Sequence, residues 1–143
     1  MTSPAFFSPS DTRHEPFVGG VRGGPRLLLR LEGAVALAAA LAAYAHLGGS
    51  WGWFAALFLV PDLSMLGYLA GPRLGAASYN AAHSYVGPAL LALASLALSA
   101  PSLLLGVALW AAHVGFDRLL GYGLKYATAF GDTHLGRVGA KPS

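Results

Sequence analysis

The sequence predicts an all-α protein, a four-helix antiparallel transmembrane bundle with both termini in the cytoplasm. Three observations support this prediction. Hydrophobic residues make up 55% of the 143 residues and charged residues only 10%, whereas a soluble domain carries about 25% charged residues. Apolar runs of about 20 residues, each able to cross a hydrocarbon core, follow one another. The basic residues fall in alternate connections between these runs. Lipid is therefore the expected solvent of most of the chain.

The first half of the chain predicts a tail and two membrane helices. Residues 1–25 are rich in Pro, Gly and Ser, which is typical of a flexible N-terminal tail. A membrane domain is expected over residues 26–138. Its first apolar run, residues 27–47, ends at the glycine-rich turn 48–50, and its second run covers residues 51–70. The short turn requires these two helices to be antiparallel neighbours.

The second half predicts two further helices and a C-terminal segment. The third run, residues 74–99, follows a Gly-Pro-Arg turn. The fourth run, residues 103–122, starts after Pro101, a residue that suits the beginning of a helix. Two glycines at its end permit the chain to reverse. We therefore expect a C-terminal segment that folds back over the cytoplasmic end of the bundle, followed by a short tail over residues 139–143.

The distribution of Lys and Arg predicts the orientation in the membrane. Basic residues lie in both terminal segments and in the middle turn: Arg13, Arg22, Arg26, Arg73, Lys125, Arg137 and Lys141. The other two turns contain none, so the positive-inside rule places both termini in the cytoplasm. The net charge of +3 suits anionic lipid headgroups, and no basic run is dense enough to indicate nucleic-acid binding.

Cleavage of the first run as a signal peptide is an alternative interpretation. Ala43-Tyr44-Ala45 resembles a signal-peptidase site after an apolar stretch. Against this interpretation, the preceding tail is long for a signal peptide and Glu32 interrupts the apolar run.

Ionisable residues fall at similar depths in the predicted helices. Counting about 1.5 Å per residue from the cytoplasmic ends places five of them in one layer of the cytoplasmic half: Glu32, Asp62, His83, His113 and Asp117. Charge in hydrocarbon is costly, so such residues usually face the bundle interior and serve a function. His113 and Asp117 are four residues apart and project from the same side of their helix.

This layer predicts a metal site in a membrane enzyme. The expected ligands are Glu32, Asp62, His83, His113, Asp117 and His134. The C-terminal segment would bring His134 near the layer, together with Asp132. Carboxylates and imidazoles suit zinc, manganese or non-haem iron. A hydrolase would use the metal to lower the pKa of a bound water and a carboxylate as base. The expected catalytic groups are Asp62, His113 and Asp117, and the expected substrate is a lipid or another amphipathic molecule.

Two other interpretations of the layer stay open. In the first, the residues only hold the helices together, with Glu32 bound to Arg30 or Arg118, Asp62 to Arg73, and His113 to Asp117. In the second, the chain is a small transporter or a proton-coupled channel subunit, since acid and His chains also serve as proton relays. Four helices enclose little space, so transport would require a homo-oligomer. The absence of cysteine excludes disulfides and thiolate ligands.

Several segments resemble the motifs of one protein family. These segments are Arg30-Leu31-Glu32-Gly33, Pro61-Asp62-Leu63-Ser64-Met65-Leu66-Gly67-Tyr68, Tyr79-Asn80 with His83, His113-Val114-Gly115-Phe116-Asp117-Arg118, Gly121-Tyr122-Gly123-Leu124-Lys125-Tyr126 and Asp132-Thr133-His134-Leu135-Gly136. They are similar to a family of small bacterial integral membrane proteins described as domain of unknown function 4260, over roughly residues 27–138. The resemblance argues against cleavage after the first helix. It also implies one module, C-terminal segment included, in the bacterial cytoplasmic (inner) membrane as a multi-pass protein.

Overall fold

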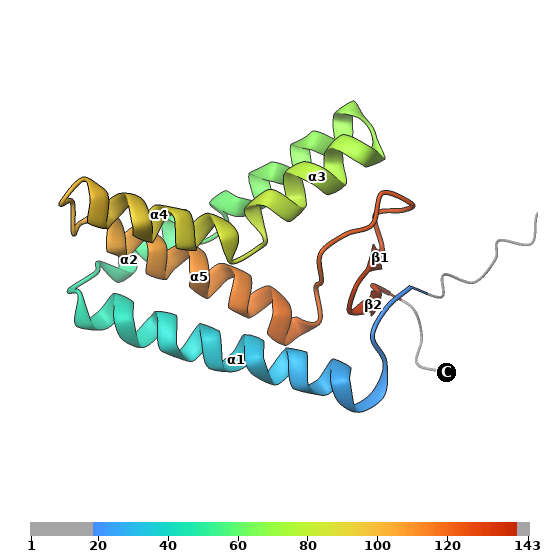
Figure 1. The fold of residues 1–143 in the computed structure, drawn as a ribbon, viewed down its shortest axis with the longest axis horizontal. Coiled ribbons are helices and arrows are strands. Elements are labelled where there is room, and N and C mark those ends of the chain that lie inside the picture. Colours follow the sequence, from blue (N-terminus) through green and yellow to red (C-terminus); the bar gives the residue numbers. More distant parts are fainter. Residues whose placement is uncertain (1–18, 140–143) are drawn as a thin grey trace, which may run out of the picture.

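The structure, a computed structural model, describes residues 19–139 (Figure 1). Most of the predicted N-terminal tail, residues 1–18, and most of the predicted C-terminal tail, residues 140–143, lie outside the described residues. The elements in chain order are α1 (Gly23–His46), α2 (Trp51–Leu57), the 3₁₀ helix η1 (Val60–Ala70), α3 (Pro72–Ala82), α4 (Val86–Ala97), α5 (Leu103–Leu120), β1 (Asp132–Thr133) and β2 (Gly136–Arg137).

The all-helical prediction is confirmed apart from the two short strands at the C-terminal end. Three helical segments are long and apolar enough to cross a membrane: Gly23–His46, Trp51–Ala70 and Leu103–Leu120. Many large apolar side chains are exposed, among them Leu69 and Leu96, which expose 87% and 75% of their surface. An apolar surface of this extent is the one that lipid would cover.

The third run is not the single helix that the sequence predicts. It consists of α3 and α4, and the break covers residues 83–85. Pro88 lies in the first turn of α4 and cannot donate a hydrogen bond to the carbonyl of Ser84, so the helix cannot continue through this point. The second run changes character at a proline as well, since Pro61 lies in the first turn of η1. The change at Pro61 lies next to Asp62, and the break between α3 and α4 begins at His83.

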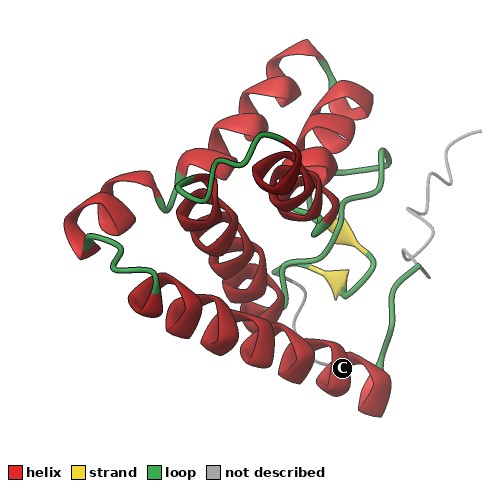
Figure 2. Ribbon diagram, turned by 60° about the vertical axis from the view of Figure 1, so that its left-hand side comes forward, coloured by secondary structure: helices red, strands yellow, loops and turns green. Residues whose placement is uncertain are grey.

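The helices pack in two groups that diverge at one end (Figures 1 and 2). In the first group α5 packs against α1 and α4, and in the second η1 and α3 form a hairpin. Gly33 and Gly115 permit the close contact of α1 and α5. A Cβ atom on Gly115 would lie 2.7 Å from the amide nitrogen of Leu37 and 2.9 Å from the carbonyl oxygen of Gly33. Such small residues let membrane helices approach closely.

The C-terminal segment packs against the open end of the helices. Gly121 ends α5 in the left-handed conformation, with φ 95°. The side chain of Asn80 on α3 accepts a hydrogen bond from the Lys125 amide at 2.7 Å and donates one to the Lys125 carbonyl at 2.9 Å. In the hairpin that follows, Asp132 pairs with Arg137 and Thr133 with Gly136. This segment therefore closes over the polar end of α3.

Candidate metal centre

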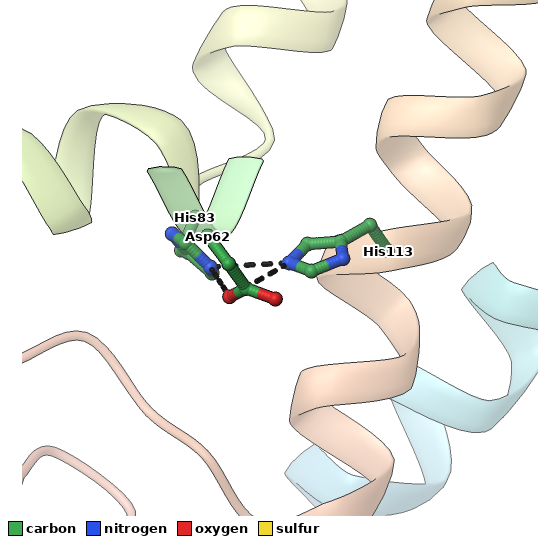
Figure 3. A group of neighbouring side chains, drawn as sticks. All are labelled: Asp62, His83 and His113. Carbon is green, nitrogen blue, oxygen red and sulfur yellow. Dashed lines mark hydrogen bonds and ion pairs between the residues drawn. The ribbon is translucent and has the colours of Figure 1, made fainter. Parts of the chain in front are cut away.

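Three side chains from three separate segments converge where the helix hairpin meets α5 (Figure 3). Asp62 lies in the first turn of η1, His83 directly follows α3, and His113 lies within α5. Both histidines are almost fully buried. One ligand atom from each residue lies within 4.8 Å of the other two. We call Asp62, His83 and His113 the triad.

The distances within the triad fit a metal ion bound at its centre. Nε2 of His83 lies 3.1 Å from Oδ1 of Asp62 and 3.1 Å from Nε2 of His113. Nε2 of His113 lies 3.6 Å from Oδ1 of Asp62. Tetrahedral zinc with bonds of about 2.0–2.2 Å requires neighbouring ligand atoms roughly 3.3–3.6 Å apart. The three distances fall close to this range without rearrangement of the helices.

The break after α3 orients the ring of His83. Its Nδ1 lies 2.9 Å from the carbonyl oxygen of Tyr79. A carbonyl can only accept, so Nδ1 carries a proton, and in the neutral ring Nε2 presents a lone pair to the triad. Metal-binding histidines commonly donate their second ring nitrogen to a carbonyl or carboxylate in this way. The ring of Tyr79 stacks on that of His83, with 3.7 Å between ring centroids, and this contact restricts rotation of the imidazole.

His113 is held by packing. The ring of Phe58 contacts it edge-on with 5.2 Å between centroids. Nδ1 of His113 is buried and has no hydrogen-bond partner among residues 19–139. The Nε2 atoms of the two histidines lie 3.1 Å apart, so two lone pairs would face each other there unless a proton or a cation lies between them. The triad therefore leaves one central position for either species.

Asp117 lies beside the triad as a fourth polar group. Its Oδ2 accepts a hydrogen bond from the hydroxyl of Tyr79 at 2.9 Å and lies 3.6 Å from Nε2 of His83. It does not belong to the set of atoms that all lie within ligand distance of one another. This position suits a group that holds a water molecule next to a bound ion.

A cavity of about 540 Å³ opens beside the triad. Its lining includes Asp62, Tyr79, Phe116, Asp117, Leu120 and Lys125. Nζ of Lys125 lies 3.6 Å from the centroid of the Phe130 ring and donates to the Phe130 carbonyl at 2.9 Å. Burial lowers the pKa of Lys125, and the nearby Asp117 carboxylate opposes that shift. The cavity thus combines carboxylates and one buried amine, and its size is that of a ligand site.

Three of the six expected ligands lie outside the triad: Asp117, described above, Glu32 and His134. Glu32 is exposed on α1. His134 accepts a hydrogen bond from the Leu124 amide at its Nδ1, with a distance of 2.7 Å. Burial lowers the pKa of His134, and the positive charge of Arg118 lowers it further. Asp132 accepts a hydrogen bond from Thr128 at 2.8 Å. The C-terminal segment thus uses the polar groups of His134 and Asp132 to stabilise its own fold.

The partners expected from a purely structural network also differ from those observed. Asp62 pairs with His83, while Arg73, its expected partner, is exposed. Arg118 donates to two carbonyl oxygens, that of His83 at 2.9 Å and that of Tyr122 at 2.7 Å. Arg30 donates to the Leu119 carbonyl at 2.8 Å. These arginines therefore satisfy backbone groups at helix ends.

The sequence interpretation missed Tyr79 and Trp110 as contributors to the site. Tyr79 binds both Asp117 and His83, and Nε1 of Trp110 donates to the Ala82 carbonyl at 2.6 Å. The spacing of four residues between Tyr79 and His83, one helical turn, was the available signal. No comparable signal connects Trp110 with Ala82, because 28 residues separate them.

Comparison with known proteins identifies a family match. The family model described as Domain of unknown function (DUF4260) matches residues 26–138. No curated protein and no solved structure matches the chain.

Proposed function

The chain belongs to the DUF4260 family, and from the geometry of its own site we propose that it is a metal-dependent membrane hydrolase. The proposed substrate is a lipid or another amphipathic ester. The observation that carries the proposal is the triad, in which three ligand atoms from separate segments lie within 4.8 Å of one another. Three protein ligands with one open position are the pattern of catalytic zinc sites.

The proposed topology is a multi-pass protein of the bacterial cytoplasmic membrane. The three long apolar helices provide three crossings, and α3 with α4 provides the fourth as a broken helix. Broken helices are tolerated in a membrane where the freed backbone is buried in protein. Trp110 and Arg118 bond the freed carbonyls of Ala82 and His83, which supports this arrangement. The positions of Lys and Arg support a cytoplasmic location of both termini and the middle turn.

The proposed chemistry is hydrolysis of an ester. A bound zinc ion would lower the pKa of its water to about 7. Asp117, positioned by the Tyr79 hydroxyl, would take a proton from that water. The water oxygen would then form a bond to the ester carbonyl carbon, the acyl carbon–oxygen bond would break, and Asp117 would return its proton to the leaving alcohol. Lys125 lines the same cavity and is available to an anionic headgroup.

Metal analysis of the purified protein tests the proposal. We expect about one zinc ion per chain after purification without chelator. His113→Ala and Asp62→Ala should lose the metal, because each removes one of three ligands. Glu32→Ala is the matched control, since Glu32 is an exposed carboxylate outside the triad. A wild-type protein with no stoichiometric metal would contradict the proposal.

A proton path is the second candidate function, and one observation favours it. The Tyr79–Asp117 hydrogen bond, the Asp117–His83 contact and the His83–His113 contact form a continuous chain of titratable groups at 2.9, 3.6 and 3.1 Å. Such chains serve as proton relays in membrane proteins. Asp62 contacts the same Nε2 of His83 at 3.1 Å, so this function requires pH-dependent proton flux in liposomes that Asp62→Asn abolishes, with no metal bound.

A further inference from the structure

A second cavity adjoins the segments that carry the triad and differs in character from the first, which we call the polar cavity. It has a volume of about 420 Å³ and an almost wholly apolar lining. Ser64 contributes a hydroxyl to the lining, and this hydroxyl has no hydrogen-bond partner among the described residues. Such a lining binds water poorly, because a cavity holds water only where it offers hydrogen-bond partners. We call this cavity the apolar crevice.

The apolar crevice, the triad and the polar cavity follow one stripe along α5. Gly106, Leu109 and Trp110 line the crevice, His113 belongs to the triad, and Phe116, Asp117 and Leu120 line the polar cavity. Their spacing of three or four residues places them on one face of the helix. Gly106 and His113 are seven residues apart, so the crevice side of this stripe is roughly 10 Å long.

The other two segments of the site contribute to both cavities. On η1, Val60 and Ser64 line the crevice, whereas Asp62 and Met65 line the polar cavity. On the broken helix, Tyr79 lines the polar cavity and Ala82, directly before His83, lines the crevice. Asp62 and His83 thus lie where residues of the two cavities meet, and along α5 His113 lies between the apolar and the polar compartment.

We propose that the apolar crevice binds the acyl chain of the substrate, so that the substrate is an acyl ester of a polar alcohol. The chain lies along the Gly106 stripe, the ester carbonyl lies at His113, and the alcohol or headgroup lies in the polar cavity. Placing the headgroup in the crevice would cost free energy, because the crevice offers almost no polar partners. The position of the ester rests on the proposed function, whereas binding of the chain itself needs no metal.

Photolabelling in lipid nanodiscs tests the occupant. The probe is a fatty acid with a photoreactive diazirine in its chain, and mass spectrometry maps the labelled residues. We expect label to concentrate on the crevice residues Leu91, Leu109 and Trp110. Leu96 is the reference, because it is 75% exposed and lies on α4 outside the crevice. Equal labelling of Leu96 and the crevice residues would overturn the proposal.

Gly106→Leu fills the crevice and should lower this labelling about tenfold, since the chain loses apolar contact. The substitution has space, because a Cβ atom on Gly106 would lie 3.4 Å from Leu91 Cδ2, an ordinary contact. Gly52→Leu is the matched control. A Cβ atom on Gly52 meets only the Ser50 hydroxyl at 3.7 Å, and labelling of the crevice should remain unchanged. Unchanged labelling in Gly106→Leu would overturn the proposal.

Asp62→Ala separates this inference from the proposed function. The variant should lose the metal and retain the label in the crevice, because Asp62 lines only the polar cavity. Crevice labelling in a wild type without metal would support the chain site and contradict the hydrolase. Bound metal with evenly spread label would contradict the chain site alone.

Discussion

At the scale of single residues, the ring of His83 shows how the site is prepared. The Tyr79 carbonyl holds the proton on Nδ1, and the Tyr79 ring stacks on the imidazole. Both contacts come from the residue one turn earlier on α3. In the neutral ring, Nε2 therefore points a lone pair at Asp62 and His113 without a conformational change. A ring left free to rotate would offer this lone pair only part of the time, which weakens a metal site.

His134 gives a prediction of pH dependence at the same scale. Burial, aided by the charge of Arg118, lowers its pKa in the folded protein, while the unfolded chain keeps a pKa of about 6.5. The unfolded state then binds more protons below that pH, so the free energy of unfolding should fall as the pH drops below about 6.5. Protonation of Nδ1 also removes the acceptor for the Leu124 amide.

Limited proteolysis of the C-terminal segment at about pH 7.5 and pH 5.5 measures this effect. Cleavage should be faster at the lower pH in the wild type. His134→Gln should reduce the difference, because glutamine does not titrate in this range. An equal pH effect in wild type and His134→Gln would show that another group is responsible.

At the scale of elements, the break between α3 and α4 decides where His83 lies. Pro88 prevents a continuous helix, and the carbonyls at the end of α3, which the break leaves without helical donors, require partners. Trp110 and Arg118 of α5 provide them for Ala82 and His83. The same two bonds attach the α3 end to α5 at the level of His113. The break and its two donors therefore bring the two histidines together.

Arg118→Met should destabilise the protein strongly. It removes the donors to the His83 and Tyr122 carbonyls, and each buried acceptor left unpaired costs about 1–3 kcal/mol. Thermal unfolding in detergent measures the loss. Arg73→Met is the matched control, because Arg73 is exposed, and its stability should stay within about 0.5 kcal/mol of the wild type. Equal melting temperatures for the two variants would contradict this role of Arg118.

At the scale of the whole molecule, the two groups of helices diverge at one end, where the C-terminal segment packs (Figure 1). Asn80 bonds both backbone groups of Lys125, and Leu135 and Thr133 are fully buried. The polar cavity lies between α5 and this segment, since Lys125 and Phe130 line it together with Phe116. The cavity thus depends on elements from both halves of the chain.

The proposed orientation predicts which turns face the outside. The chain contains no cysteine, so single cysteines report their own position. Ser50→Cys and Ser102→Cys should react with a membrane-impermeant maleimide on intact cells, because no basic residue holds those turns in the cytoplasm. Pro72→Cys should react only after permeabilisation. Reaction of Pro72→Cys on intact cells would reverse the orientation.

Three of the predicted site residues could be identified from the sequence because acid and histidine in apolar runs are conspicuous. Glu32 had the same signal but lies on another face of α1. The face packed against α5 contains Gly33 and Ala40, and one residue turns a helix by about 100°. The depth of a residue along a helix can be counted from the sequence. The direction in which its side chain points depends on which face of the helix packs against a neighbour.

The sequence by itself determined the helical class, the apolar helices and the presence of buried acid and imidazole, because composition and periodicity are local properties. Only the tertiary structure decided that Asp62, His83 and His113 meet while Glu32 and His134 stay apart. Their meeting depends on the break after α3, on the bonds from Trp110 and Arg118, and on the close approach of α1 and α5. These are contacts between distant segments, and no local pattern in the sequence specifies them.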